Sequence, residues 1–267
     1  MTRLFTADYS TGDFSQWTAL TQANRPYQEL GYEWPHTGAY PAQIVSADCP
    51  DAGYAARFEV RSGDVPSGFS SGERCEVIST SGYDLVGTTR WYAFSVKFDS
   101  AFPTDHPNDV GWGNVMQWHD HPNGAGSPVL SMGWAASTVS GQSPGYWYLF
   151  QSKQSAPLTY VGDALPLVEL PMDVGQWQDI KLRVVWKQDD TGTVQLWRNG
   201  VRQTFTEAAG GGTTFTGQTV CPPGGGGSPA VTGVMPQQGY YRHIQVGAPT
   251  GVVYHRGYRV ADSEGSL

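Results

Sequence analysis

Large apolar residues alternate with small or polar ones along several short stretches of the chain. The pattern is clearest over residues 91–98 and 179–186, where every second side chain is bulky and apolar. Successive side chains of a β-strand point to opposite faces, so this spacing predicts strands with one face in a core. The core positions expected on these two strands are Tyr92, Phe94, Val96, Phe98, Ile180, Leu182 and Val184.

Four further stretches, residues 55–60, 146–150, 193–197 and 252–260, have the length and the apolar or aromatic content of strands. The dipeptide Asn199-Gly200 follows one of them and is a strong hairpin signal. No stretch has the apolar spacing of a three-turn helix, so we expect less than about 10% helix. Short strands without crossover helices predict an all-β fold, an antiparallel two-sheet β-sandwich.

Glycine is concentrated in residues 207–235, which contain the runs GGG at 210–212 and GGGG at 224–227. This composition would suit an interdomain linker. However, the strand patterns that follow need partners earlier in the chain. We therefore expect a single domain over residues 1–267, in which 207–235 is a long, mobile loop and forms a flap beside a groove.

The charge of the chain excludes one class of partner. The formal net charge is −8, which argues against a nucleic-acid-binding protein. No apolar run approaches the roughly 20 residues of a membrane span, and the first residues lack the hydrophobic core of a signal peptide. We expect an extracellular or virion-associated protein with no membrane span.

Three cysteines cannot all pair within one chain. Cys75 follows Arg74, so Cys75 faces the core if Arg74 lines a groove. This leaves Cys49 and Cys221 as a candidate disulfide, although sequence spacing does not determine whether their geometry allows the bond.

Polar side chains with catalytic potential occur at alternate positions of three strand-like segments. Arg74 and Glu76 share one face of the first, Gln117 and His119 share one face of the second, and Tyr241 lies on the third. Each pair taken alone would be ordinary surface polarity or a salt bridge. Together, an arginine, a glutamine, a histidine and a tyrosine on one sheet face would suit an acidic sugar.

Six motifs occur in an order that resembles the jelly-roll polysaccharide lyases, a group that includes heparin lyase I-like and glucuronan lyase-like proteins and, more distantly, alginate lyases. The resemblance covers roughly residues 12–262. It implies a concanavalin-like jelly roll with a concave groove, and it puts Arg74, Gln117, His119 and Tyr241 at the active-site positions. The motifs are GDFSQW at 12–17, GERCEV at 72–77, WYAFSV at 91–96, QWH at 117–119, WRNG at 197–200 and GYYR at 239–242.

Such a lyase cleaves a uronic-acid glycan by β-elimination, which removes the C5 proton and expels the O4 leaving group. Arg74 would neutralise the sugar carboxylate with its planar fork of donors, and Gln117 would add an amide donor. Histidine ordinarily titrates near 6.5, so His119 suits a base. Tyr241 would be the acid, or both acid and base if Arg242 or Arg74 favours its ionised form.

The expected partner is an acidic polysaccharide. Since the chain has only four lysines, the groove would depend on a few cations and polar residues. The expected substrate-binding residues are Glu76, Arg90, Lys97, Trp118, His121 and Arg242. No third ligand joins His119 and His121, so we predict no catalytic metal and no cofactor. The Asp-rich loops leave a structural calcium ion open, without pointing to particular ligands.

Two other functions stay open at this level. The same sandwich serves as a lectin, and Trp112, Trp118 and Trp134 could stack on sugar rings, so the chain could be a non-catalytic glycan-binding or adhesion domain, for example of a phage tail that meets host envelope glycans. A glycoside hydrolase is less favoured, because no closely spaced carboxylate pair stands out on one strand.

Overall fold

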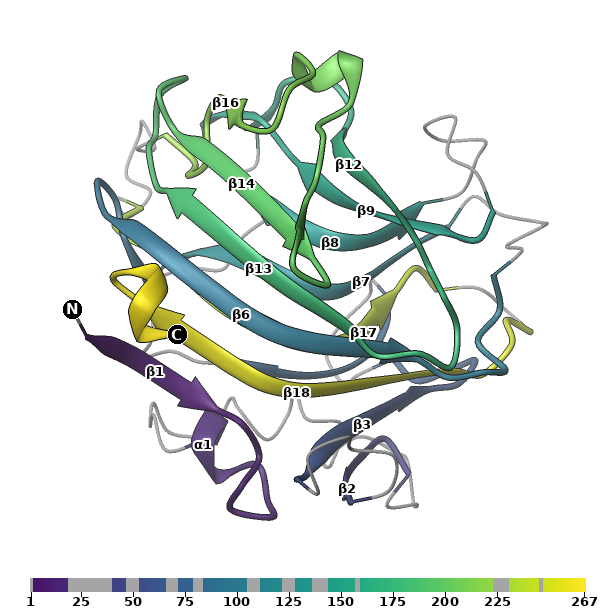
Figure 1. Ribbon diagram of the computed structural model, residues 1–267. Helices are drawn as coiled ribbons and strands as arrows, with labels where there is room; N and C mark the ends of the chain where they lie inside the picture. Colours follow the sequence, from purple (N-terminus) through teal and green to yellow (C-terminus); the bar gives the residue numbers. More distant parts are fainter. Residues whose placement is uncertain are drawn as a thin grey trace.

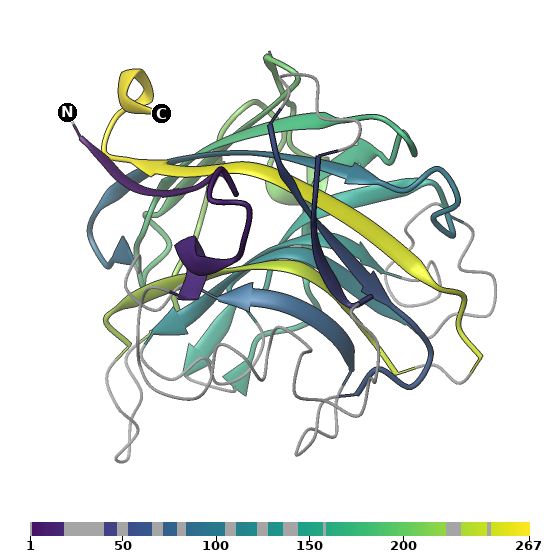
Figure 2. The ribbon, with the colours of Figure 1, turned by 90° about the horizontal axis from the view of Figure 1, so that it is seen from below.

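Two antiparallel β-sheets pack face to face in the computed structural model, as Figures 1 and 2 show. The β-sandwich expected from the alternation is therefore confirmed. The structure describes the residues in the following ranges: 2–18, 40–46, 53–65, 72–78, 84–104, 111–121, 128–135, 144–156, 159–222, 231–244 and 247–267.

In the described parts of the chain, one sheet has nine strands, in the order β15-β14-β13-β6-β18-β3-β2, with β1 beside β18 and β16 beside β14. All of the strand pairs are antiparallel, and the chain ends lie close together on this sheet (Figure 1). The strands are β1 (Arg3–Ala7), β2 (Ala42–Val45), β3 (Ala55–Val60), β6 (Thr89–Phe98), β13 (Gln178–Val185), β14 (Thr193–Arg198), β15 (Val201–Arg202), β16 (Phe215–Thr216) and β18 (Gly251–Ala261).

The other sheet has seven strands among the described residues, in the order β12-β9-β8-β7-β17-β4, with β5 beside β17. A separate small ribbon pairs β10 with β11. The strands are β4 (Glu73–Ile78), β5 (Asp84–Leu85), β7 (Trp112–His121), β8 (Leu130–Ala135), β9 (Tyr146–Gln151), β10 (Gln154–Ala156), β11 (Thr159–Tyr160), β12 (Leu165–Pro171) and β17 (Gly233–Arg242).

Helix is scarce, as expected. The described residues form one short α-helix, α1 (Ser15–Thr18), and two 3₁₀ turns, η1 (Glu207–Ala209) and η2 (Glu264–Ser266). Within these ranges, no helix has the length and apolarity that crossing a membrane requires.

The core lies between the sheets and contains the side chains that the alternation placed there. All seven predicted core residues of β6 and β13 are at most 2% exposed. Tyr92 of the nine-stranded sheet meets Trp118 of the seven-stranded sheet edge to face, with ring centroids 5.4 Å apart. The predicted Asn199-Gly200 hairpin is also present. Both residues have positive φ, 50° and 78°, as a two-residue type I′ turn requires.

The expectation of one continuous loop over residues 207–235 is corrected in the described parts, while the mobility of the segment stays a prediction. Residues 207–222 contain η1 and β16, and β16 pairs with β14. Gln218 is buried, and its side-chain amide accepts from the backbone N–H of Gln154 and donates to the backbone carbonyl of Gln154, which anchors the segment. Residues 233–235 already belong to β17, and 223–230 lie outside the described residues.

The candidate disulfide, which the sequence left open, is not formed, because Cys221 is a free, buried thiol. Its backbone N–H donates to Asp120 Oδ1 at 3.3 Å, and burial raises the pKa of the thiol to about 12. Cys49 lies outside the described residues. Cys75 is fully buried in the core, as its alternation with Arg74 predicted.

Candidate active site

Three neighbouring strands of the seven-stranded sheet bring the predicted catalytic residues together. In the register of β4 and β17, Arg74 lies opposite Tyr241, and in the register of β17 and β7, Gln237 lies opposite Gln117. His119 follows two residues along β7. The residues between them point into the core, so the four predicted side chains share the face that points away from it. The alternating core residues are Cys75, Trp118 and Tyr240.

A bulge fixes where this face begins on β7. The pairing of β7 with β8 shifts between Asn114 and Met116, and the consecutive residues Val115 and Met116 are both fully buried. The alternation therefore reverses there, which puts Trp112 on the same face as Gln117. The Trp112 ring meets the Tyr241 ring edge to face at 4.6 Å.

A chain of contacts links the side chains on this face. The Arg74 guanidinium lies over the Tyr241 ring, 3.8 Å from its centroid. Arg74 Nη1 is 3.9 Å from Glu76 Oε2, and the Gln117 amide donates to Glu76 Oε1. Glu76 thus lies between the arginine and the glutamine and orients both.

His119 is only 7% exposed, although it lies on the face away from the core. Burial, assisted by the positive charge of Arg74, lowers the pKa of His119 to about 4. The imidazole is therefore neutral near pH 7 and can accept a proton. Among the described residues, neither His119 Nδ1 nor Gln117 Oε1 has a hydrogen-bond partner. These two buried polar atoms, two residues apart on one strand, are thus available to hydrogen-bond with a ligand or a water molecule.

Glycine at position 72 is a requirement of the site that the pattern analysis missed. Gly72 has φ +85°, and a Cβ there would lie 2.0 Å from Tyr241 Cε2. No side chain fits between this backbone and the Tyr241 ring. The sequence signal was present, since Gly72 opens the GERCEV motif, but only the fold shows what the glycine accommodates.

Of the predicted substrate-binding residues, Glu76 alone is placed beside the catalytic set. Trp118 is fully buried in the core, because it alternates with His119. His121 pairs with Gly233, but its side chain lies outside what the structure describes. Trp134 is also a core residue, 4% exposed. The expectation that Trp118 or Trp134 stacks on sugar was therefore wrong.

The three predicted cations Arg90, Lys97 and Arg242 do not join the site either. Arg90 and Lys97 belong to β6 of the opposite sheet. Arg90 pairs with Asp84 of β5 at 2.6 Å. Arg242 alternates with Tyr241 and turns inward, 3% exposed, to pair with Glu73 at 2.7 Å. Arg74 is thus the cation that lies against Tyr241.

The described residues contain no group of three or more His, Cys, Asp or Glu side chains placed to hold a metal ion. The polar groups of the site are those of an acid–base and anion-binding centre: a guanidinium, an amide, a neutral imidazole and a phenol.

A family model described as polysaccharide lyase matches residues 9–259. The chain belongs to this family. A search of curated proteins gave no match. The fold and the match together support lyase activity on polysaccharides, as the motif order implied.

Solved structures with the same fold include lyases and hydrolases. The endo-β-1,4-glucuronan lyase of the fungus Trichoderma reesei has a TM-score of 0.60 and 15% identity, over 86% of this chain and 92% of that one. The catalytic domain of a glycoside hydrolase family 131 protein from Coprinopsis cinerea has a TM-score of 0.59 and 11% identity, over 99% of this chain and 96% of that one. The GH131 β-glucanase catalytic domain from Podospora anserina has a TM-score of 0.58 and 13% identity, over 100% of this chain and 98% of that one. At these identities the likeness concerns the fold of this polysaccharide lyase.

Proposed function

We propose that this polysaccharide lyase cleaves a uronic-acid-containing glycan by β-elimination. The observation that carries the proposal is the placement of Arg74 against the Tyr241 ring, at 3.8 Å, on the same face as Gln117 and His119. A cation, an amide, a proton acceptor and a proton donor are the groups that this reaction needs. The name of the glucuronan lyase neighbour agrees with such a substrate.

Carboxylate neutralisation falls to Arg74 and Gln117. The proton at C5 is barely acidic beside an ionised carboxylate, so negative charge must be drawn off as the C–H bond breaks. Arg74 offers charged donors, and the second N–H of the Gln117 amide remains available after the first reaches Glu76. Preorganised donors of this kind contribute about 3–4 kcal/mol each in other enzymes.

Proton transfer falls to His119 and Tyr241. The low pKa of His119, about 4, keeps it neutral at pH 7 and ready to accept the C5 proton. Tyr241 is the acid that protonates the O4 leaving group. Where the C5 proton and O4 lie on the same side of the ring, Tyr241 serves as both base and acid.

The hydrolase alternative is weakened by the positions of the carboxylates. On the described strands of this sheet, Glu76 and Glu169 are the acidic side chains on the site face, and they belong to β4 and β12, at opposite edges. Five strand spacings of about 4.8 Å separate them by roughly 24 Å. A glycosidase pair stands about 5–9.5 Å apart. This chain therefore shares the fold of the GH131 proteins, but the described strands hold no carboxylate pair at that distance on the site face.

The test is a panel of glucuronan, alginate, heparin-type and hyaluronan-type chains, followed by the ultraviolet absorbance of the unsaturated product. New chain ends with this chromophore support elimination. Reducing ends without it would favour hydrolysis. Binding to a panel member without any cleavage would favour the glycan-binding or adhesion alternative.

A further inference from the structure

The face of the nine-stranded sheet that points away from the core carries a strip of basic and aromatic side chains. On β6, the residues that alternate with the core are Trp91, Ala93, Ser95 and Lys97. At about 3.3 Å per residue, these four extend over roughly 20 Å. Cations flank them on the neighbouring strands. The lysine and arginine residues on this face include Arg57, Lys181, Arg183, Arg202, Arg256, Arg259 and the largely buried Lys97.

A cavity of about 720 Å³ opens on this strip. Ala93 and Ser95 line it, and the arginines Arg3, Arg256 and Arg259 surround it. It lies where the pairing of β18 with β6 shifts between Arg256 and Arg259. Ligand sites are typically about 300–1,000 Å³, so the cavity has the size of a binding site.

Aromatic side chains lie toward both ends of the strip, outside the lining of the cavity. Trp91 stacks on Trp197, with centroids 5.6 Å apart, and Lys181 lies 4.6 Å from the Trp197 ring. At the other end, Lys97 lies 4.6 Å from the Tyr254 ring and the Arg256 guanidinium 4.7 Å from that of Trp177. Indole and phenol rings provide flat apolar surfaces on which sugar rings pack.

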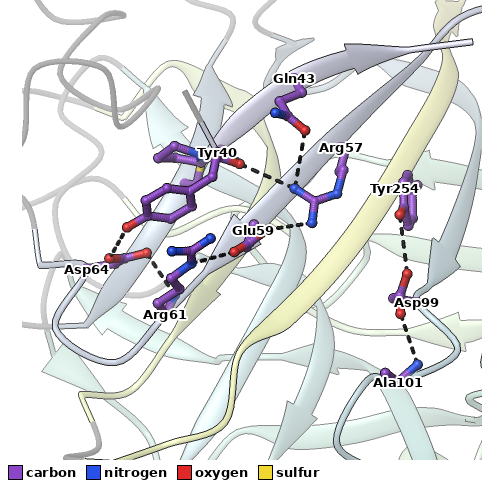
Figure 3. Close-up of polar contacts among 11 residues, drawn as sticks. Tyr40, Gln43, Arg57, Glu59, Arg61, Asp64, Asp99, Ala101 and Tyr254 are labelled. Carbon is purple, nitrogen blue, oxygen red and sulfur yellow. Dashed lines mark hydrogen bonds and ion pairs between the residues drawn. The ribbon is translucent and has the colours of Figure 1, made fainter. Parts of the chain in front are cut away.

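Two arginines at β3, Arg57 and Arg61, lie on either side of Glu59, as Figure 3 shows. Glu59 is buried and accepts from both Arg57 and Arg61, so this triplet keeps a net positive charge. The Arg61 guanidinium lies 3.6 Å from the Tyr40 ring centroid. A cation on an aromatic ring thus recurs at this end of the sheet.

The acidic groups around the cavity already have partners. Asp179 Oδ1 accepts from Ser95 Oγ at 2.6 Å and also lies 3.9 Å from Arg256 Nη2, and Lys181 pairs with Glu264. Asp8 Oδ1 accepts from Ser10 Oγ at 2.6 Å and from Gln16 Nε2 at 2.8 Å. Three arginines and two aspartates line the cavity, so its local charge is positive although the protein carries −8 overall. A local field of this sign attracts an anionic ligand.

We propose that this strip is a second, non-catalytic binding site for a polysaccharide chain that carries carboxylates. Arginine forks bind carboxylates in a planar geometry, and the tryptophan pair supports a neighbouring sugar ring. The strip lies on the opposite sheet from Arg74 and Tyr241, so it holds the polymer at a place where no cleavage occurs. The inference takes its ligand class from the proposed function, and it takes the place of the site from the charge and shape of this face.

The experiment measures binding of poly-β-1,4-glucuronate and of alginate by calorimetry, in a Tyr241→Phe background that suppresses cleavage. The double variant Arg256→Gln/Arg259→Gln removes two charges at the cavity, and Lys181→Gln/Arg202→Gln removes two beside Trp197. Lys153→Gln/Lys187→Gln removes two charges outside the strip as the matched control. Thermal melting verifies the fold of each variant. A carboxyl-reduced polymer tests the charge requirement.

The strip variants should weaken binding of at least one polymer by about tenfold or more, since each loses charged contacts, and the control should stay within twofold. Binding of the carboxyl-reduced polymer should fall similarly in the parent protein. The proposal would be overturned if the affinity is unchanged in both strip variants or if the control loses as much affinity as they do. Strong binding of the carboxyl-reduced polymer would overturn it too, and so would a parent protein that binds neither polymer. Calorimetry measures binding and not the chromophore of the cleaved product. A negative result in the lyase assay can therefore be told apart from a negative result here.

Discussion

His255 Nε2 lies 2.9 Å from the carbonyl oxygen of Gly239, across the core from one sheet to the other. His255 is fully buried on β18, and burial lowers the pKa of its imidazole to about 3, so the ring is neutral and Nε2–H donates. Gly239 lies at the shift in pairing between β17 and β7, two residues before Tyr241. The nine-stranded sheet thus holds the backbone that aims the proposed acid.

Replacing His255 with Phe should therefore lower both stability and turnover. The Gly239 carbonyl would lose its partner inside the core, which costs about 1–3 kcal/mol. Denaturant unfolding measures the first effect and initial rates measure the second. His243→Phe, at an exposed histidine near the same strand, is the control and should change stability little. Equal behaviour of the two variants would remove any positioning role from His255.

Gly72→Ala should reduce activity because the new methyl group would meet the Tyr241 ring at 2.0 Å. Gly87→Ala provides a matched control, since Gly87 has φ +88°, close to the +85° of Gly72, but no atom within 4 Å of the added Cβ. Both variants carry the same backbone strain, and only one displaces Tyr241. The rate ratio between them isolates the displacement. Similar rates in the two would show that the ring position is unimportant.

Tyr241→Phe should lower the turnover by about 10²–10⁴-fold, since it removes the proton carrier and keeps the ring under Arg74. Glycan affinity should be retained, which calorimetry checks. Tyr146→Phe removes a hydroxyl from an exposed tyrosine of β9 in the same sheet and should leave the turnover unchanged. A fully active Tyr241→Phe enzyme would assign the acid to another group.

The histidine ring proton signals of the protein should show His119 titrating near pH 4. The charge of Arg74 contributes to this low pKa, so Arg74→Gln should raise it toward the ordinary value near 6.5. The same shift predicts that the acidic limb of a pH–rate profile falls near pH 4 if His119 is the base. If the pKa of His119 is the same in the Arg74→Gln variant, the guanidinium lies farther from the imidazole than in the structure.

Asp120 should make stability fall as pH rises. Burial raises the pKa of its carboxyl from 3.8 to about 6, although the Cys221 N–H opposes the shift. The folded protein therefore holds the proton more tightly than the unfolded chain. The contribution of this group to the free energy of unfolding is fully present below about pH 4 and is lost as pH rises through about 6. A shift of about two pKa units corresponds to a loss of up to roughly 3 kcal/mol.

Asp120→Asn keeps an oxygen acceptor for Cys221 and cannot ionise. Urea unfolding from pH 4 to 8 should therefore show a smaller decline in the variant than in the parent protein, with the gain at the alkaline end. Asp163→Asn, at an exposed position, should follow the parent curve. Parallel curves for all three proteins would mean that Asp120 is less buried than the structure shows.

Alternation of side chains is a local property that can be read from the sequence alone. It predicted several of the strands, the buried faces of β6 and β13, and the shared face of Gln117 and His119, because a strand turns successive side chains to opposite sides whatever it pairs with. The same rule, applied to Trp118 and Arg242, would have excluded both from the site. Charge and aromaticity alone do not tell which face of a strand a side chain occupies.

Tertiary structure decided what parity cannot express. A strand pattern does not say which sheet the strand joins, so Lys97 and Arg90 belong to the nine-stranded sheet, away from Arg74. Whether two cysteines meet depends on how distant segments pack, and Cys221 is free. The glycine-rich appearance of residues 207–222 concealed β16, whose strand geometry comes from its partner β14 and not from its own side chains. Pairing between distant strands is the physical information that a single sequence leaves out.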